Sequence, residues 1–457
     1  MMKPEQVRSA ADARAIVEER GLAHVKVGVF DNDGVLRGKY MAREKFFSAL
    51  DKGFGFCDVV LGWDSNDQLY DNTKYTGWHT AYPDAPVRVL PSSCRELSLE
   101  GNALFFLGEF AEGAETVCPR AVLRRVLARA AGLGFDVSAA AEFEFFMFRE
   151  TPDSVREKGY RGLQTLTPGY FGYSVLRSSV HSEFYHALLK LCEDMRFPLE
   201  GLHTETGPGV LEAAIQYTDA LEAADRGALF KTFTKVLAQR SGYMATFMAK
   251  WSKDWPGQSG HLHVSLQRRA DGGAVFHDAA QPHGISETMR WFIGGQQALM
   301  PELLAMVAST VNSYSRLVPG FWAPTSATWG IENRTTALRV IGGGPKSQRV
   351  EYRIAAADIN PYLALAVAIG SGLWGIEHQI EPDAAITGNA YERKYPARRQ
   401  LPRTLTEAAE WLARSKAAPE LFGAAFVEHF AASREWEERE FRRAVTDWEL
   451  ARYFEII

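Results

Sequence analysis

The chain has 457 residues, of which 46% are hydrophobic and 23% charged, with a formal net charge of -5 at pH 7. This length predicts two domains, or one domain with a large barrel, and the negative charge argues against nucleic acid as an obligate partner. No signal peptide is evident, the four cysteines form no CxxC pair, and the longest apolar run, residues 362–376, is too short to span a bilayer. We therefore expect a cytoplasmic protein without a membrane partner, in which that run is a buried helix.

Residues 1–115 predict a small α+β domain. Apolar runs over 24–30 and 35–40 flank an Asp-Gly step, which is a strong signal for a hairpin. The aromatic, acidic and Gly-rich residues 53–71 predict a loop. The other expected elements are helices over 10–20 and 42–50 and strands over 87–89 and 103–108.

Residues 116–457 are expected to form a second domain. Pro119 marks the first turn of a helix that runs to residue 133. Strands and helices then alternate, which favours an α/β arrangement around a sheet. Residues 405–454 are predicted to be helical and charged. Their expected packing anchors are Trp411, Trp436 and Trp448.

Three short segments of the second domain alternate charged with apolar side chains. Since successive side chains of a strand point to opposite faces, each segment predicts a strand with one charged face. Such a face usually points to solvent, but three of them with unlike charges, together with an acidic Gly-rich loop, favour a site. The residues concerned are Glu142 and Glu144, then His261, His263 and Ser265, then Glu351 and Arg353, with Glu205 and Glu212 from the loop.

Six of these residues form a donor set typical of hard divalent cations. Carboxylates with a single imidazole suit Mg²⁺ or Mn²⁺ better than Zn²⁺. Two adjacent cations are what phosphoryl transfer uses to neutralise charge around the transferred group. We therefore predict an enzyme that uses ATP and holds two or more Mg²⁺ or Mn²⁺ ions per site. The predicted ligands are Glu142, Glu144, Glu205, Glu212, His261 and Glu351.

Seven spaced motifs indicate a family. AEFEFF, HTETGPGVLE, SGHLHVSL, NSYSRLVPGFWAP, ENRTTALRV, GPKSQRVEYR and NPYLALA follow one another in the chain. In these motifs and their order the chain resembles glutamine synthetases and their γ-glutamyl-amine ligase relatives. The resemblance implies an α+β fold, with an N-terminal β-grasp domain over 1–115 and a catalytic domain over 116–457 built on an incomplete antiparallel barrel. It also implies a homo-oligomer, a dodecamer of two hexameric rings with each active site between neighbouring subunits.

The resemblance further implies a role for each matched residue. One cation would be held by Glu144, Glu205 and Glu212, and the other by Glu142, His261 and Glu351. The nucleotide or its phosphates would be contacted by His263, Ser265, Arg339, Lys346 and Arg349. Glutamate or the transferring phosphoryl group would be gripped by Gly257, Arg316, Arg334 and Arg353. The residue types agree with these roles, because planar guanidinium groups bind carboxylates and phosphates bidentately.

Three departures from the glutamine synthetase pattern favour an organic amine over ammonia. Trp322 stands where glutamine synthetases carry the Glu of R-L-V-P-G-Y-E-A-P, which closes over the ammonium ion. The F-D-G-S-S segment of the first domain is missing, which leaves Asp58 or Asp64 as candidates for its acid, and Val210 replaces the usual Gln. An indole cannot remove a proton as a carboxylate does, but its face can hold an ammonium group or an alkyl chain.

The aromatic residues near these motifs are candidate walls of an amine pocket. They are Trp251, Trp255, Phe321, Trp322 and Trp329, and Trp322 is preferred. With Arg316 and Arg334 it completes the predicted catalytic set.

The expected activity is ATP-dependent ligation of the γ-carboxylate of glutamate to a small organic amine. The reaction would pass through γ-glutamyl phosphate and give a γ-glutamyl amide, ADP and phosphate, in amine catabolism. Three alternatives stay open: a glutamine synthetase that uses ammonium, a catalytically silent oligomeric relative, and an acyl donor other than glutamate. Every matched metal ligand and arginine is present, which favours catalysis over the silent relative.

Overall fold

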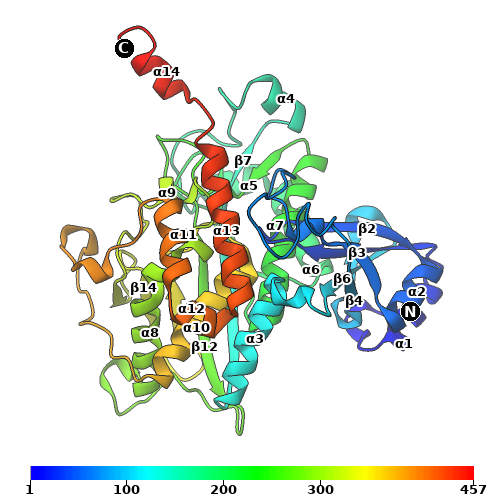
Figure 1. Ribbon diagram of the computed structural model, residues 1–457, viewed down its shortest axis with the longest axis horizontal. Coiled ribbons are helices and arrows are strands. Elements are labelled where there is room, and N and C mark those ends of the chain that lie inside the picture. The colour runs from blue at the N-terminus through cyan, green and yellow to red at the C-terminus, as the bar shows by residue number, and fades with distance from the viewer. Residues whose placement is uncertain (1) are drawn as a thin grey trace.

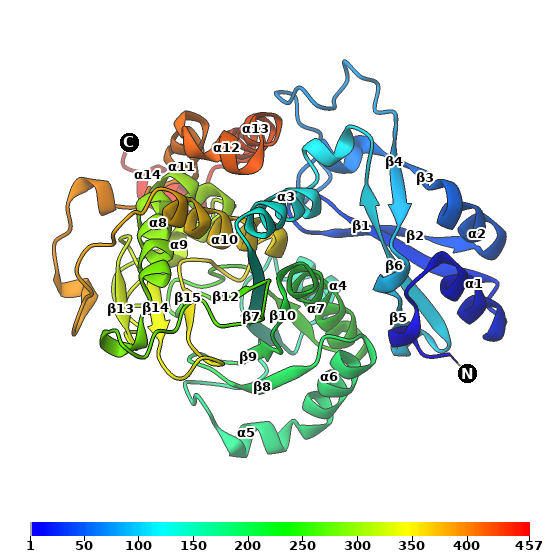
Figure 2. The ribbon, with the colours of Figure 1, turned by 90° about the horizontal axis from the view of Figure 1, so that it is seen from below.

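The structure is a computed structural model that describes residues 2–457 (Figure 1). Two sheets organise the chain, one of six strands and one of nine. They lie side by side, and the polypeptide passes from the first to the second through helix α3 (Pro119–Gly132) (Figure 2). The fold is α+β, as expected.

The first sheet is built around the predicted hairpin. Strands β1 (His24–Phe30) and β2 (Leu36–Ala42) pair antiparallel, and β6 (Ala103–Phe110) pairs parallel with β1. The remaining elements are α1 (Ala10–Glu19), α2 (Arg43–Lys52), β3 (Phe54–Cys57), β4 (Asp84–Val89) and β5 (Arg95–Leu97). The prediction of a loop over 53–71 was wrong at its start, because β3 pairs with β4 there and buries Phe54. The β-grasp assignment and the domain boundary at 115/116 remain predictions.

The second sheet has the order β13-β14-β15-β12-β7-β9-β8, with β10 and β11 also paired to β7. All these pairs are antiparallel except β13 with β14. The α/β arrangement suggested by the alternation of elements was therefore wrong, and the antiparallel half-barrel implied by the resemblance is confirmed. Its strands are β7 (Phe135–Phe148), β8 (Leu199–Thr204), β9 (Val210–Ile215), β10 (Thr218–Asp219), β11 (Met244–Thr246), β12 (Gly260–Arg268), β13 (Trp329–Ile331), β14 (Leu338–Ile341) and β15 (Arg349–Tyr352).

Helices cover one face of this sheet (Figure 2). The covering helices include α7 (Ala220–Arg240), α8 (Glu287–Leu303) and α10 (Pro361–Glu377). Phe143 and Phe145 of β7 point into this layer and pack against Phe230 of α7, so the alternating residues Glu142 and Glu144 face the opposite way. The other helices are α4 (Pro152–Glu157), α5 (Val175–Val180), α6 (Ser182–Asp194), α9 (Ser313–Arg316), α11 (Leu405–Arg414), α12 (Ala417–Phe422), α13 (Ala424–Phe441) and α14 (Asp447–Tyr453).

The apolar run over 362–376 forms most of α10, and nearly all of its side chains are buried, as predicted. Pro361 occupies the first turn of α10, and the side chain of Asn360 accepts a hydrogen bond from the Tyr362 N–H. Across residues 2–457, none of the helices combines the length and the hydrophobicity needed to cross a bilayer.

The C-terminal helices differ in how they pack. Trp436 of α13 is 5% exposed and is the packing anchor that the sequence predicts, whereas Trp448 of α14 is 61% exposed. The prediction for Trp448 was wrong, because α14 projects away from the body of the protein (Figure 1).

Candidate active site

A cavity of about 540 Å³ opens on the polar face of the nine-stranded sheet. Most of the residues predicted for the site line it, and Ser265 and Lys346 are the exceptions. Ser265 lies farther along β12, and Lys346 lies in the exposed loop between β14 and β15. The predicted residues in the lining are Glu142, Glu144, Glu205, Glu212, Gly257, His261, His263, Arg316, Trp322, Arg334, Arg339, Arg349, Glu351 and Arg353.

Strand register explains why these side chains meet. His261 of β12 pairs with Glu142 of β7, and His263 pairs with Glu351 of β15. On the other side of β7, Glu144 pairs with Glu212 of β9. Because residues in register on neighbouring antiparallel strands lie on the same face, the acids and imidazoles gather in one row across the sheet.

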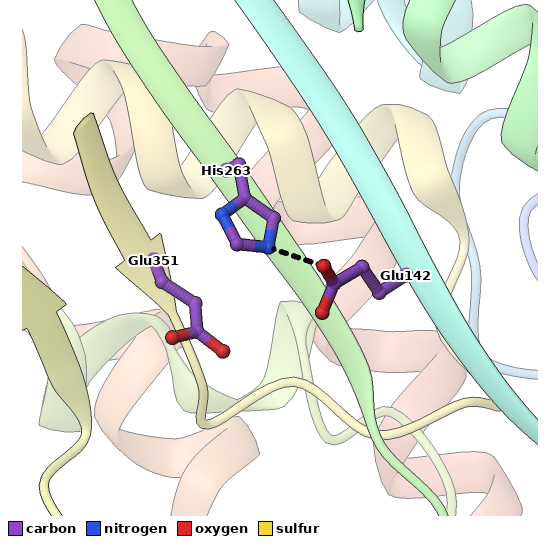
Figure 3. A group of neighbouring side chains, drawn as sticks. All are labelled: Glu142, His263 and Glu351. Atoms are coloured by element: carbon purple, nitrogen blue, oxygen red, sulfur yellow. Dashed lines mark ion pairs between the residues drawn. The ribbon is translucent and has the colours of Figure 1, made fainter. Parts of the chain in front are cut away.

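One group of ligand atoms, the first cluster, consists of Glu142, His261, His263 and Glu351. Figure 3 shows three of its members, with His263 Nε2 at 3.0 Å from Glu142 Oε1. The ligand atoms of Glu142, His263 and Glu351 all lie within 4.8 Å of one another. His261 Nδ1 lies 3.3 Å from Glu351 Oε1 and 3.9 Å from Glu142 Oε2. The resemblance assigns His261 to the cation, and the geometry brings His263 to the same carboxylates.

The second cluster consists of His203, Glu205 and Glu212, whose ligand atoms also lie within 4.8 Å of one another. His203 lies 3.8 Å from both carboxylates, and the ring of Tyr173 stacks on its imidazole at 4.4 Å. The sequence analysis missed His203. Its signal was the spacing of two residues from Glu205, which places both side chains on the same side of an extended segment.

The acids of the cavity repel one another. Burial, followed by the nearby carboxylates of Glu144 and Glu142, raises the pKa of Glu212 to about 9. Burial also raises the pKa of Glu144, although Ser259 donates hydrogen bonds to this carboxylate from its N–H (2.8 Å) and its hydroxyl (2.7 Å). A bound cation would relieve this repulsion and restore the charged carboxylates.

The side chains fit a hard divalent cation. His261 Nε2 and Glu205 Oε2 are buried and have no hydrogen-bond partner among the described residues. Burial, followed by Arg353 and Arg316, holds the pKa of His261 well below its usual range, so its imidazole is neutral and able to ligate. Carboxylates with imidazole suit Mg²⁺ or Mn²⁺.

Two arginines are ordered by Glu351. Its carboxylate accepts hydrogen bonds from Arg353 Nη1 at 2.5 Å and from Arg339 Nη1 at 3.1 Å. Glu351 is 2% exposed, so these charge-assisted bonds are shielded from water. Glu351 therefore fixes the positions of two guanidinium groups while it faces the first cluster.

Arg316 and Arg334 both line the cavity, but Arg316 is buried and Arg334 is exposed. Arg316 is 1% exposed and donates from Nη1 to Ile354 O at 2.9 Å. Burial lowers its pKa to about 10, so it stays charged at neutral pH. A Cβ on Gly257 would lie 2.6 Å from Arg316 Cγ, which explains glycine at that position. Arg334 is exposed and makes no ion pair with residues 2–457, so it is free to bind an anion.

Aromatic side chains form the rim of the cavity. Phe321 and Trp322 line it, and Trp322 has a backbone φ of 59°, in the left-handed region that bulky residues rarely adopt. Its indole is 57% exposed, so it is not packed into a core. A bulky residue in a strained conformation at the mouth of a cavity is a candidate for ligand contact.

The other predicted walls and acids lie outside the cavity lining. Trp329 is buried and donates from Nε1 to Asp383 O at 2.6 Å, and Trp251 packs on the rings of Phe146 and Phe148. Trp255 packs against Tyr170. Asp58 and Asp64 are buried in the N-terminal part of this chain.

Comparison with known proteins agrees with this geometry. Residues 116–453 match the family profile described as glutamine synthetase, catalytic domain. A type-1 glutamine synthetase 2 of Dictyostelium discoideum is 46% identical over 438 residues, which cover 95% of this chain and 84% of the relative. A glutamate–isopropylamine ligase of Pseudomonas sp is 36% identical over 465 residues, which cover 100% of both chains. A gamma-glutamylethanolamide synthetase, GlnA4, of Streptomyces coelicolor is 35% identical over 448 residues, which cover 97% of this chain and 95% of the relative.

A solved structure described as apo GmaS without ligand superimposes with a TM-score of 0.83 at 27% identity, covering 97% of this chain and 99% of that chain. The family profile covers most of the chain, and relatives align along nearly its whole length. The chain therefore belongs to the glutamine synthetase family of ligases.

Proposed function

We propose that the protein is an ATP-dependent glutamate–amine ligase that joins the γ-carboxylate of glutamate to a small organic amine. The observation that carries the proposal is the aromatic rim, where Trp322 lines the cavity. The resemblance assigns the ammonium-closing acid of glutamine synthetases to this position. The names of two relatives, an isopropylamine ligase and an ethanolamide synthetase, support it.

The residues of the cavity suit a reaction in two steps. In the first step, a γ-carboxylate oxygen of glutamate attacks the γ-phosphorus of ATP, and the bond to the leaving ADP breaks. Arg316 and Arg334 would orient the carboxylates of glutamate, and Arg339 and Arg353 would face the charge that develops on the phosphoryl oxygens. In the second step, the amine nitrogen attacks the acyl carbon, phosphate leaves, and the nitrogen loses a proton.

The two clusters would hold the divalent cations that this family uses. Glu142, His261 and Glu351 of the first cluster, with His263 beside them, are proposed for one ion. Glu205 and Glu212 of the second cluster, together with Glu144 in register with Glu212 and with His203 beside them, are proposed for the other. When bound, Mg²⁺ or Mn²⁺ neutralises charge on the phosphates of ATP.

An organic amine substrate would account for tryptophan in place of glutamate at position 322. An alkylammonium has a pKa of roughly 10, close to that of lysine, and carries apolar surface. The face of Trp322 can hold such a group by cation–π attraction and by apolar contact, whereas a carboxylate suits a bare ammonium ion. The rim would therefore favour organic amines and place them above the acyl group.

A glutamine synthetase that uses ammonium is the second candidate. It is favoured by the 46% identity to a type-1 glutamine synthetase. The two candidates share every metal ligand and arginine named above, so only the second substrate separates them.

The test is phosphate release from ATP with Mg²⁺ and glutamate fixed, across alkyl, aryl and polyamines and ammonium, with mass spectrometry of the amide. We expect release with one class of organic amine and little with ammonium. Faster release with ammonium than with every organic amine would select the glutamine synthetase. A lack of release with any amine would contradict both and favour a silent relative or a different acid.

We also propose a cytoplasmic location, a role in amine catabolism and a dodecamer of two hexameric rings. The chain mass is 50.9 kDa, so light scattering should give about twelve times that value. A monomer or dimer in solution would contradict the assembly.

A further inference from the structure

A second cavity, of about 460 Å³, lies between the region of the first sheet and the region of the second sheet. Its walls come from the turn between β1 and β2, from α7 and α13, and from the segments before α9 and after β15. It shares no lining residue with the candidate active site. Its volume falls within the range of small-molecule sites, which is about 300–1,000 Å³.

Four charged side chains of this cavity have no ionic partner. They are Lys231 and Lys235 of α7, Asp358, and Glu437 of α13. None of the four makes an ion pair with any residue from 2 to 457, although the neighbouring Arg434 and Asp33 pair with each other at 2.8 Å. Positive and negative groups therefore line one space without reaching one another.

Two half-buried members of this set, Lys231 and Asp358, keep hydrogen-bonding capacity that no described residue uses. Lys231 Nζ donates to Ile359 O at 2.6 Å and lies over the rings of Phe143 (5.7 Å) and Phe247 (5.8 Å), but no second oxygen among the described residues accepts from it. Asp358 Oδ1 is buried and has no hydrogen-bond partner in the described chain. Burial lowers the pKa of Lys231 to about 7 and raises that of Asp358, as expected for charges that lack close partners.

We propose that this second cavity binds a small zwitterion, namely a free α-amino acid. Its carboxylate would lie between Lys231 and Lys235, and its ammonium group would face Asp358 and Glu437. A ligand with only one charge would satisfy only one half of the cavity and would leave the other half unpaired. The opposite signs of the unpaired groups therefore select a ligand that carries both charges.

The cavity is connected to the candidate active site through α9. Asp358 Oδ2 accepts hydrogen bonds from Thr310 Oγ1 at 2.8 Å and from Ser313 Oγ at 2.7 Å. Ser313 begins α9, and Arg316, which lines the first cavity, ends it. A ligand that binds Asp358 would therefore change the contacts at the start of α9, the helix that ends at Arg316. This part of the inference rests on the proposed function, and it predicts that the amino acid changes the KM for glutamate.

The binding test needs no turnover. We would titrate the full-length protein with L-alanine by calorimetry in the absence of ATP, and follow thermal unfolding with a panel of L-amino acids. Acetate and methylammonium, each with one of the two charges, are the matched probes. We expect L-alanine or another amino acid to bind at least about tenfold more tightly than either probe.

Two pairs of variants locate the binding. Lys235→Gln and Glu437→Gln each remove one charge from the cavity, and each should weaken binding about tenfold or more. Lys45→Gln on α2 and Glu435→Gln on α13 change exposed residues outside the cavity and should leave binding within about twofold. Lys235 is itself exposed and Glu437→Gln is nearly isosteric, so we expect both variants to fold.

Two results would overturn the proposal. One is that no amino acid in the panel binds or shifts the unfolding temperature. The other is binding that survives both Lys235→Gln and Glu437→Gln, because an amino acid at the candidate active site would behave in this way. Binding that is lost in these variants would support the second cavity even if the protein ligates no organic amine.

Discussion

The candidate active site and the Arg434–Asp33 contact at the junction of the first sheet with α13 both bury charged groups, but they satisfy them differently. At the junction, Arg434 pairs with Asp33 at 2.8 Å and donates to Ser309 O at 2.6 Å, and His429 Nε2 lies 2.8 Å from Leu61 O. In the candidate active site, carboxylates face one another, and buried acceptor atoms lack partners among the described residues. Groups satisfied within the chain hold the fold together, whereas groups left unsatisfied by the chain are available for a ligand.

The largest effect on stability is expected at the junction. Arg434→Met removes one partner of a buried ion pair and leaves Asp33 uncompensated, which should lower the free energy of unfolding by about 3–5 kcal/mol. Urea denaturation measures this loss. Arg439→Met on the same helix breaks a more exposed pair with Asp71 and should cost about 1 kcal/mol or less. Equal losses of stability in the two variants would contradict the claim that the buried ion pair contributes more than the exposed one.

The largest effect on activity is expected in the first cluster. Glu351→Gln weakens the hold on Arg339 and Arg353 and removes a proposed ligand charge, so kcat/KM should fall about 10²–10³-fold, or roughly 2.7–4 kcal/mol. The free energy of unfolding should also fall, though less than in Arg434→Met, because Arg339 and Arg353 lose a buried anion but keep an amide oxygen as acceptor. Glu332→Gln is the control, since Glu332 also pairs with Arg339 but is exposed. A similar loss of activity in both variants would contradict the assigned role of Glu351.

The metal-free protein should lose stability as the pH rises. The pKa of Glu212 is about 9 in the folded chain against an ordinary 4.5, so between these values the folded state holds a proton that the unfolded chain has released. Over this window each pH unit lowers the free energy of unfolding by up to about 1.4 kcal/mol, which amounts to about 2.5 kcal/mol between pH 6 and pH 8.

Unfolding at pH 6 and pH 8 in the presence of a chelator measures this pH effect. Added Mg²⁺ or Mn²⁺ should restore the stability at pH 8, because the cation takes the place of the proton. Glu212→Gln should flatten the dependence. A metal-free protein that becomes more stable from pH 6 to pH 8 would show that these acids do not repel one another as described.

The smallest expected effect concerns the choice of amine. Trp322→Glu should shift the ratio of kcat/KM values toward ammonium by about tenfold, while Trp322→Phe should shift it less because the aromatic face remains. The measurement is the ratio for ammonium and the best organic amine in each variant. An unchanged ratio in Trp322→Glu would make the indole a structural residue of the rim.

Much of the candidate site could be predicted because strand geometry repeats every two residues. The alternation of Glu142 and Glu144 with phenylalanines fixed which side chains share a face, and β7 places these acids on the lining of the cavity. Local alternation does not determine strand partners, so the antiparallel order of the sheet came from the resemblance to a family rather than from the periodicity. His203 was missed because a single histidine beside an acid is common, and only the β8–β9 pairing brings it to Glu212.

Features that depend on contacts between distant segments could not be predicted from the sequence. The second cavity joins Asp33, Lys231, Asp358 and Glu437, which no local pattern connects. Trp448 was predicted to pack because tryptophans are usually buried, yet α14 extends away from the body and leaves the indole exposed.

The most direct test of the account is a competition between substrates. The protein is given ATP, Mg²⁺, glutamate and equal concentrations of ammonium and the best organic amine, and mass spectrometry measures the ratio of γ-glutamyl amide to glutamine. This ratio equals the ratio of the two kcat/KM values, and we predict a value of at least about 10 in favour of the amide. A product that is mainly glutamine would contradict the proposed substrate and would make the protein a glutamine synthetase with an aromatic rim.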